Sequence, residues 1–284
     1  MNNTEDITAD QALDHLTWLV DMGADETIGD EPVDRFAASA ERLRNQQAGQ
    51  ATPAPAPIAA RSAPPSRPVQ PPVSTEQTVQ DSRRIASSCE TLGDLEEALK
   101  TFDACPLKRT ATNLCYADGN PQARVMFIGE APGRDEDIQG KPFVGRSGQL
   151  LDKMLAAIGL DRNAGEPDKA AFITNVIYWR PPGNRKPTEN ETLMCMPFVE
   201  RTIELQSPDF IVCLGATPMQ RLTGRTDGIL KSRGRWMEIE VAGRAIPLVA
   251  TLHPAYLLRQ PAQKRLAWRD FLEIRIRLDG LTRS

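Results

Sequence analysis

Histidine is nearly absent from this 284-residue sequence, which contains only His15 and His253. Two imidazoles this far apart in the sequence exclude a histidine-rich metal site. His15 belongs to an acidic N-terminal segment, whereas His253 lies in the stretch Leu252-His253-Pro254-Ala255-Tyr256-Leu257-Leu258-Arg259. Any imidazole chemistry in the C-terminal region therefore depends on His253.

The sequence also lacks the features of several other protein classes. No stretch of about 20 apolar residues is present to span a membrane, and the acidic N-terminus does not have the form of a secretory signal. The five cysteines are odd in number and lack a disulfide spacing, which predicts reduced thiols in a cytoplasmic protein. Because neither a Rossmann nor a P-loop glycine signature occurs, an unrelated α/β enzyme that binds nucleotide phosphates is disfavoured.

Charge and proline content divide the chain near residue 80. Residues 1–80 carry 12 Asp or Glu and five Arg, a net charge of −7, whereas the remaining residues carry 26 acidic and 29 basic side chains, a net charge of +3. Eight of the 23 prolines lie between Pro53 and Pro72, in a segment that cannot bury enough apolar surface to fold. We therefore predict an acidic arm at 1–45, a disordered Pro/Ala-rich linker at 46–80 and a folded domain at 81–284.

The acidic arm contains a helical pattern. A capping box at residues 8–11 precedes leucines at helical spacing up to Gly23, and a second short helical stretch is expected at 36–44. Two interpretations stay open: the first helix packs on its own domain, or it binds a protein partner. The second is suggested by the ten acidic residues, and no Lys or Arg, in residues 1–34.

Beyond residue 80, short apolar runs alternate with helical patterns. We expect strands at 124–128, 172–174, 210–214 and 246–252, and helices at 91–100, 147–159, 188–206 and 262–278. Helices between buried strands imply a parallel sheet that is covered on both faces. The predicted fold class is therefore α/β, a three-layer α/β/α sandwich with a central four-stranded parallel sheet.

Four motifs lie where these strands end. Gly129-Glu130, Asn175, Gly215 and His253 each coincide with or follow the carboxyl end of a predicted strand. Ligands of open α/β sheets bind at that edge. We therefore expect the four motifs to meet in one site.

Each candidate residue also has an ordinary structural explanation. Phe143, between Pro142 and Gly145, could be a core residue, the basic segment 180–187 could be a solvated loop, and His253 could be a buried structural histidine. Asn175 is different, because a buried amide needs partners and its donor and acceptor suit a planar heterocycle. The basic segment and the Leu257-Leu258-Arg259 stretch also fit contact with a DNA backbone and entry into a duplex.

In combination the motifs resemble the uracil-DNA glycosylase superfamily, and in particular its bacterial family 4. The resemblance covers about residues 101–278 and rests on the order GEAPG, GKPFVGRSGQLLD, ITNVIYWRPPGNRKPT, LG and LHPAYLLRQP. It implies a monofunctional, base-flipping repair enzyme that hydrolyses the N-glycosidic bond of deoxyuridine in DNA and leaves an abasic site. It also implies a monomer. A related branch traps abasic DNA with a loop histidine, which residues 183–187 lack.

The resemblance assigns roles to individual residues. It implies that Phe143 stacks on uracil, that Asn175 binds its polar edge and that His253 donates a hydrogen bond to uracil O2 as charge develops there. We chose Leu257 as the wedge that fills the vacated base stack. Arg185 and Arg259 are the expected phosphate ligands.

Water activation departs from the family pattern at Ala131. The best-studied branch has an aspartate at this position, and alanine has no group that orients water. Glu130 is the nearest carboxylate and is our candidate for activating water, with Ala131 and Glu136 lining the uracil site. The missing aspartate also motivates an alternative, a non-catalytic relative that binds uracil or abasic sites in DNA.

The second departure concerns the [4Fe–4S] cluster that family 4 enzymes typically hold with four cysteines. Cys105 and Cys195 match the second and fourth ligands, but Phe102 and Trp179 occupy the first and third positions. Two thiolates cannot hold a standard cluster. We therefore predict no metal and no cofactor, with the two aromatic rings filling the space; retention of the cluster is the alternative.

Overall fold

The computed structural model describes residues 75–282. The predicted arm at 1–45, its helices and residues 46–74 of the predicted linker lie outside the described residues. The predicted end of the linker at residue 80 is wrong, because α3 (Thr75–Ser87) already begins at Thr75. Its buried side chains Thr78, Ser82 and Ala86 are small and recur every fourth residue, which lets α3 pack on α7 (Glu189–Gln206).

Six strands form one sheet in the order β1-β3-β2-β4-β6-β5. The four central strands are parallel neighbours and match the four predicted strands; they are β3 (Phe172–Asn175), β2 (Val125–Gly129), β4 (Phe210–Leu214) and β6 (Arg244–Thr251). The predicted α/β class is confirmed. The predicted number of strands is wrong, since β1 (Ala117–Gly119) and β5 (Trp236–Val241) add antiparallel edges.

The two edge strands escaped prediction for different reasons. β1 has only three residues, all half-buried, and no apolar run marks it. β5 does carry a signal, because Trp236-Met237-Glu238-Ile239-Glu240-Val241 alternates apolar and acidic residues as a half-buried strand does. It pairs with β6 through a tight turn at Ala242-Gly243, where both residues have positive φ.

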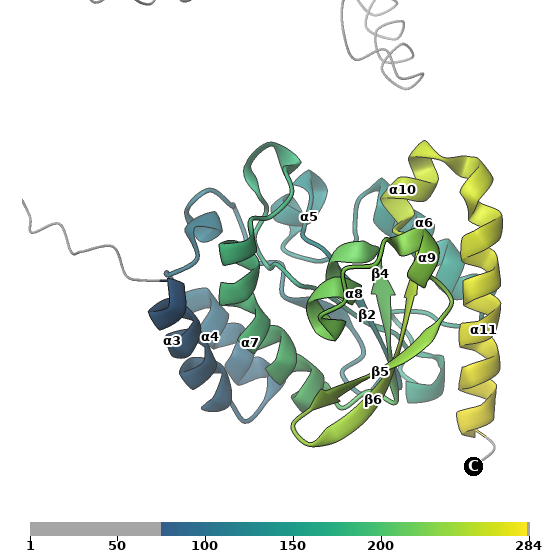
Figure 1. Ribbon diagram of the computed structural model, residues 1–284, viewed down its shortest axis with the longest axis horizontal. Coiled ribbons are helices and arrows are strands. Elements are labelled where there is room, and N and C mark those ends of the chain that lie inside the picture. Colours follow the sequence, from purple (N-terminus) through teal and green to yellow (C-terminus); the bar gives the residue numbers. More distant parts are fainter. Residues whose placement is uncertain (1–74, 283–284) are drawn as a thin grey trace, which may run out of the picture. The chain divides into compact units, whose positions relative to one another are not determined.

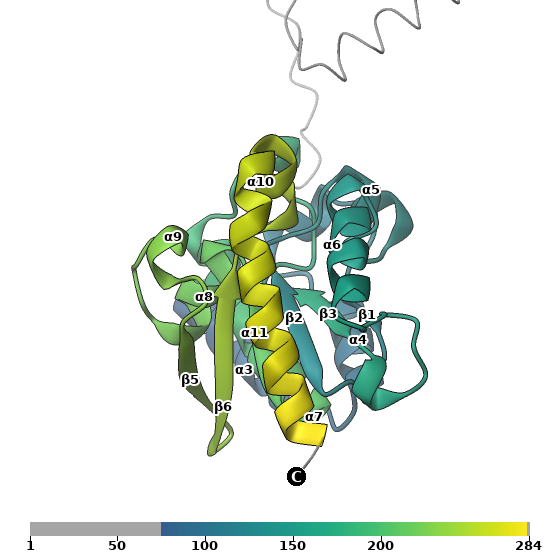
Figure 2. The same ribbon diagram turned by 90° about the vertical axis from the view of Figure 1, so that its right-hand side faces the viewer.

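Helices cover both faces of the sheet (Figures 1 and 2). Met126 and Ile128 of β2 share a core with α4 (Leu92–Thr101) and α7, while Val125 and Phe127 share another with α6 (Arg146–Ala157) and α11 (Lys264–Thr282). Alternate side chains of β2 thus pack into two hydrophobic layers, one on each face of the sheet, as the sandwich prediction requires. The remaining helices are α5 (Arg134–Gln139), α8 (Ala216–Thr223), α9 (Ile229–Ser232) and α10 (Pro254–Arg259), with 3₁₀ turns at Pro106–Arg109, Pro167–Lys169, Pro182–Asn184 and Pro261–Gln263.

The predicted helix starts are confirmed at two caps. The Thr91 and Thr188 side chains accept hydrogen bonds from the backbone N–H groups of Asp94 and Glu191, and each helix carries a complete capping box. None of the helices in the described part of the chain combines the length and the apolar character that crossing a bilayer requires.

A buried ion pair fastens α11 to the sheet. Asp270 of α11 accepts hydrogen bonds from the Arg233 guanidinium, at 2.5 and 3.0 Å, and from the Thr251 hydroxyl of β6 at 2.7 Å. Asp270 and Thr251 are both buried. Arg233 also donates a hydrogen bond to the Leu266 carbonyl. Removal of the Asp270 carboxylate would leave the largely buried Arg233 guanidinium without its counter-charge.

Asp270→Ala is expected to lower the free energy of unfolding by about 3–5 kcal/mol, as loss of one partner of a buried pair does. The matched control is Asp279→Ala on the same helix, which removes an exposed pair with Arg275 and should cost less than about 1 kcal/mol. Urea denaturation of both variants measures the two values. Equal losses would contradict the assigned role of Asp270.

Candidate active site

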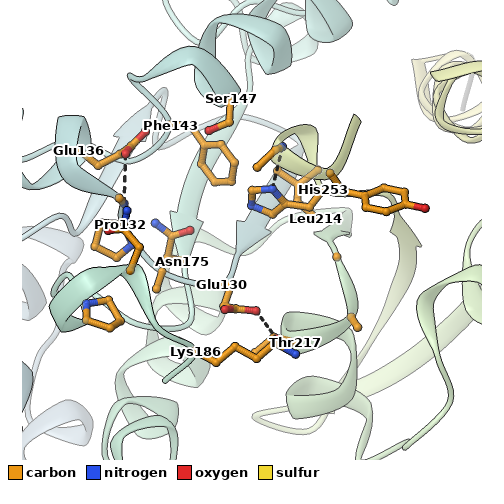
Figure 3. Close-up of a pocket in the computed structure, with 18 of the residues that line it drawn as sticks. Glu130, Pro132, Glu136, Phe143, Ser147, Asn175, Lys186, Leu214, Thr217 and His253 are labelled. Atoms are coloured by element: carbon orange, nitrogen blue, oxygen red, sulfur yellow. Dashed lines mark hydrogen bonds between the residues drawn. The ribbon is translucent and has the colours of Figure 1, made fainter. Parts of the chain in front are cut away.

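A cavity of about 590 Å³ opens at the carboxyl edge of the sheet. Glu130 follows β2, Asn175 ends β3, Gly215 follows β4 and His253 follows β6, and all four line this cavity. The structure thus brings together the motifs that were expected to meet. Figure 3 shows Asn175, Phe143, His253 and Glu130 arranged around one space.

Asn175 is the most unusual polar group in the cavity. Its side chain is 1% exposed, and its Oδ1 atom has no hydrogen-bond partner within the described residues. An unpaired buried acceptor costs about 1–3 kcal/mol, which a ligand that brings an N–H group would recover. The amide is therefore poised for a donor that the protein does not supply.

Gly129 allows Asn175 and Phe143 to lie this close to the end of β2. A Cβ atom on Gly129 would come within 2.3 Å of Asn175 Oδ1 and 2.6 Å of the Phe143 ring. Such distances are too short for any side chain, so only glycine fits here. The glycine of the GEAPG motif is thus required by the packing of the cavity wall.

Phe143 is held in an uncommon backbone conformation. Its φ is +53°, its side chain is 4% exposed, and its ring lies 5.5 Å from the His253 ring at an angle of 31°. Arg162 donates hydrogen bonds to the carbonyls of Pro142 and Phe143 at 3.1 and 2.9 Å. Because the ring is fixed in the cavity wall, it can serve both as a core residue and as a flat surface for a base.

Glu136 braces the loops on both sides of this wall. Its Oε2 accepts a hydrogen bond from Gly133 N at 3.1 Å, and its Oε1 accepts from Val144 N and Gly145 N at 3.1 and 2.9 Å. Glu136 lines the cavity, as expected. Since three backbone groups share its carboxylate, it is a poor candidate for a base.

His253 is held in one tautomer by its own helix. It is the N-cap of α10, and its Nδ1 accepts a hydrogen bond from Ala255 N at 3.1 Å. The ring proton of the neutral imidazole therefore belongs on Nε2. Burial, with a smaller contribution from Arg259, lowers the pKa of His253 to about 4, so that the ring is a neutral N–H donor at pH 7.

Glu130 is the carboxylate available in the cavity. Its Oε2 accepts a hydrogen bond of 2.5 Å from the Thr217 hydroxyl at the start of α8. Ala131 lines the same space, where its methyl group cannot bind water. Thr217, Ser147 and Tyr256 also line the cavity and were not predicted. Thr217 could have been found, because it lies just beyond Gly215 at a strand end that the sequence marks.

The prediction that Leu257 is the duplex wedge is wrong for this structure. Leu257 is 1% exposed and packs with Leu252 and Ala267 in a small core. The helical turn of α10 points it inward, while the next residue, Leu258, is 36% exposed. The sequence shows two adjacent leucines but not which one faces solvent.

Arg185, one of the two expected phosphate ligands, lines the cavity but is paired with a carboxylate of the protein itself. Its guanidinium forms two hydrogen bonds to the carboxylate of Glu191, at 2.9 and 2.7 Å, and the pairing lowers the pKa of Glu191 to about 2. Arg185 thereby anchors the N-terminal turn of α7. Lys186 and Arg259 also line the cavity, and no ion pair within the described residues engages either one.

The four residues at the expected cluster positions are buried in one core. Phe102 and Trp179 stack with ring centroids 6.4 Å apart, and Phe102 meets Phe198 edge-on at 5.0 Å. Hydrogen bonding with the side chain of Cys195 lowers the pKa of the Cys105 thiol. In residues 75–282, no group of three or more His, Cys, Asp or Glu side chains is arranged to bind a metal ion. Two thiols beside two packed rings do not fit a [4Fe–4S] cluster.

Comparison with known proteins identifies relatives of this chain. Residues 116–272 match the family model described as the uracil DNA glycosylase superfamily. The chain is 39% identical to the type-4 uracil-DNA glycosylase of Archaeoglobus fulgidus over 189 residues, which are 65% of this chain and 92% of the relative. It is 40% identical over 171 residues to the Thermotoga maritima protein of the same name, which are 60% of this chain and 84% of the relative. The Saccharolobus solfataricus protein of that name is 35% identical over 191 residues, 66% of this chain and 86% of the relative.

The imidazole of His253 is expected to titrate near pH 4 in the folded protein, against 6.5 for an ordinary histidine. Between these values only the unfolded chain binds the proton, so the contribution of His253 to stability falls as the pH drops through this window. Imidazole NMR resolves the two histidines of the chain, and His253→Gln identifies the relevant signal. A midpoint near 6.5, or a proton on Nδ1 at pH 7, would contradict the assignment.

Proposed function

This chain belongs to the uracil-DNA glycosylase superfamily, and from that membership we propose that it is a DNA repair enzyme that releases uracil from DNA. The reaction is hydrolysis of the N-glycosidic bond of deoxyuridine, which leaves an abasic site. The relatives that it matches along most of their length are named type-4 uracil-DNA glycosylases. The target base must leave the duplex to reach a cavity at the edge of the sheet.

The unpartnered amide oxygen of Asn175 is the observation that supports this proposal best. Uracil carries an N3–H donor between two carbonyl oxygens, so its polar edge offers Asn175 Oδ1 the missing hydrogen bond. Cytosine presents an unprotonated N3 and an amino group instead. A buried group left unpaired by the wrong base disfavours that base strongly.

His253 supports the bond-breaking step. When the bond between C1′ and N1 breaks, its electron pair stays with uracil, and negative charge accumulates on O2. The Nε2–H of a neutral imidazole can donate a hydrogen bond to that oxygen without giving up its proton. A fixed donor of this kind contributes about 10²–10³ to the rate of comparable reactions.

Glu130 is the proposed partner of the attacking water. The water oxygen forms a bond to C1′ of the positively charged sugar, and one water proton passes to the carboxylate. The leaving group, the uracil anion, takes up a proton as it leaves. Since the sugar is already cationic, the reaction needs less help at the nucleophile than at the leaving group, which is compatible with Ala131.

Lys186 joins Arg259 as a proposed phosphate ligand, because both cations line the cavity whereas Arg185 is paired with Glu191. Leu258 replaces Leu257 as the proposed wedge, because it is the exposed leucine of α10. The proposal further includes a monomer in the cytoplasm, an acidic arm at 1–45 that binds another protein, and a linker that ends before Thr75.

We also propose that the enzyme works without an iron–sulfur cluster. The support is that Phe102 and Trp179 stack on each other at two of the four expected ligand positions, which leaves cysteines at the other two, Cys105 and Cys195. Apolar packing then stabilises the segment around Trp179, which in a cluster-containing relative would be held by cysteine ligands of the cluster.

A glycosylase assay tests the proposed function. The full chain is expected to convert a uracil-containing oligonucleotide into an alkali-labile product, and His253→Ala should lower the rate by about 10²–10³ with DNA binding retained. His15→Ala, the only other histidine substitution that the chain offers, should leave the rate unchanged. Binding of uracil DNA without any cleavage after alkali would instead identify a non-catalytic relative.

Asn175→Asp is expected to weaken the preference for uracil over cytosine, because the second acceptor oxygen meets uracil O4 without a donor. The measurement is the ratio of the rates on the two bases in otherwise identical oligonucleotides. An unchanged ratio would mean that another group reads the base.

Iron analysis tests the absence of the cluster. A freshly purified preparation is expected to contain no stoichiometric iron and to lack absorption near ~400 nm, where thiolate-bound iron–sulfur clusters absorb. Four iron atoms per chain would refute the proposal.

A further inference from the structure

Thr217 lines the cavity next to Glu130 but has no role in the proposed reaction so far. It is the second residue of α8, directly after the turn at Gly215 that ends β4. Gly215 has a φ of +105°, a conformation that glycine adopts readily, and lines the cavity beside His253. The turn thus directs the first residues of α8 toward the cavity.

The Thr217 hydroxyl contacts the carboxylate of Glu130, which lines the cavity. It donates a 2.5 Å hydrogen bond to Glu130 Oε2, and the two residues are 87 positions apart in the sequence. Within the described residues Glu130 Oε1 has no hydrogen-bond partner, while both oxygens of Glu136 are engaged by backbone N–H groups. Figure 3 shows the contact between Glu130 and Thr217 on the side of the cavity opposite Phe143.

A glutamate needs such a contact more than an aspartate does. Its side chain has one more rotatable bond, so that a free carboxylate samples many orientations. A hydrogen bond to one oxygen fixes the carboxylate plane and leaves the other oxygen for a second partner. Small displacements of a reacting group reduce rates by up to about 10²-fold, so a hydrogen bond that fixes the carboxylate can increase the reaction rate.

We propose that Thr217 is a positioning residue that orients Glu130 toward the attacking water. The inference rests on the proposed glycosylase activity. Thr217 Oγ holds Oε2, and Oε1 accepts a proton from water while the water oxygen bonds to C1′. The C1′–N1 electron pair leaves with uracil, which is protonated in turn, so the net reaction is addition of one water across the broken bond.

Single-turnover uracil release by the full chain tests the role of Thr217. Thr217→Val keeps the shape and removes the donor, and is expected to lower the rate of the chemical step by about 10- to 100-fold with little change in KM. Thr217→Ser retains a hydroxyl and should recover most of the rate. Thr223→Val is the matched control, because Thr223 lies on the same helix and donates to the Met219 carbonyl within it.

A double variant separates positioning from a structural role. If Thr217 acts through Glu130, adding Thr217→Val to Glu130→Gln should produce no further loss of rate. Thr217→Ala repeats the comparison should the valine variant be unstable. A wild-type rate in both Thr217 variants, or the same fold-loss with and without Glu130→Gln, would overturn the proposal. An inactive wild-type chain would instead remove the proposed function and this inference with it.

Discussion

The close approach of Asn175 and Phe143 to Gly129 is the contact on which the cavity depends. No other residue fits at the end of β2, because a Cβ atom would lie 2.3 Å from the amide oxygen and 2.6 Å from the ring. Gly148 imposes a similar constraint from the other side, since a Cβ there would lie 1.9 Å from the Phe143 carbonyl oxygen. Arg162 then fixes that carbonyl, so the aromatic wall is held by steric exclusion and charge-assisted hydrogen bonds together. Rigid placement of a flat ring beside an unpaired amide prepares the site before a base arrives.

Two acidic side chains that follow β2, Glu130 in the loop and Glu136 in α5, have different roles because of where they lie. Glu136 is consumed by three backbone donors and joins the turn at Gly133 to the loop that carries Phe143. Glu130 instead shares a single hydroxyl and keeps one oxygen open. The two carboxylates lie within seven residues of the sequence. Only the folded structure shows that Glu136 binds backbone N–H groups and that Glu130 is the candidate base.

Much of the site could be predicted from the sequence, because it is built at strand ends. The continuous apolar runs that end at Gly129, Asn175 and Leu214 revealed three central strands, and parallel pairing dictated that their carboxyl ends meet. Side-chain orientation was not accessible in the same way. Leu257 and Leu258 are identical residues on one helical turn, and which is buried depends on the packing of α10 against Ala267. The pairing of Arg185 with Glu191 likewise depends on how the proline-rich loop returns to α7.

The central claim is that Asn175 and His253 converge on one flipped uracil. The most direct measurement is a crystal structure with DNA that contains 2′-fluoro-2′-deoxyuridine, in which the glycosidic bond resists cleavage. The account predicts uracil stacked on Phe143, with N3–H donating to Asn175 Oδ1 and His253 Nε2–H donating to O2, each within hydrogen-bond distance. A uracil that remains in the duplex, or one that lies in the cavity without contacting either side chain, would contradict it.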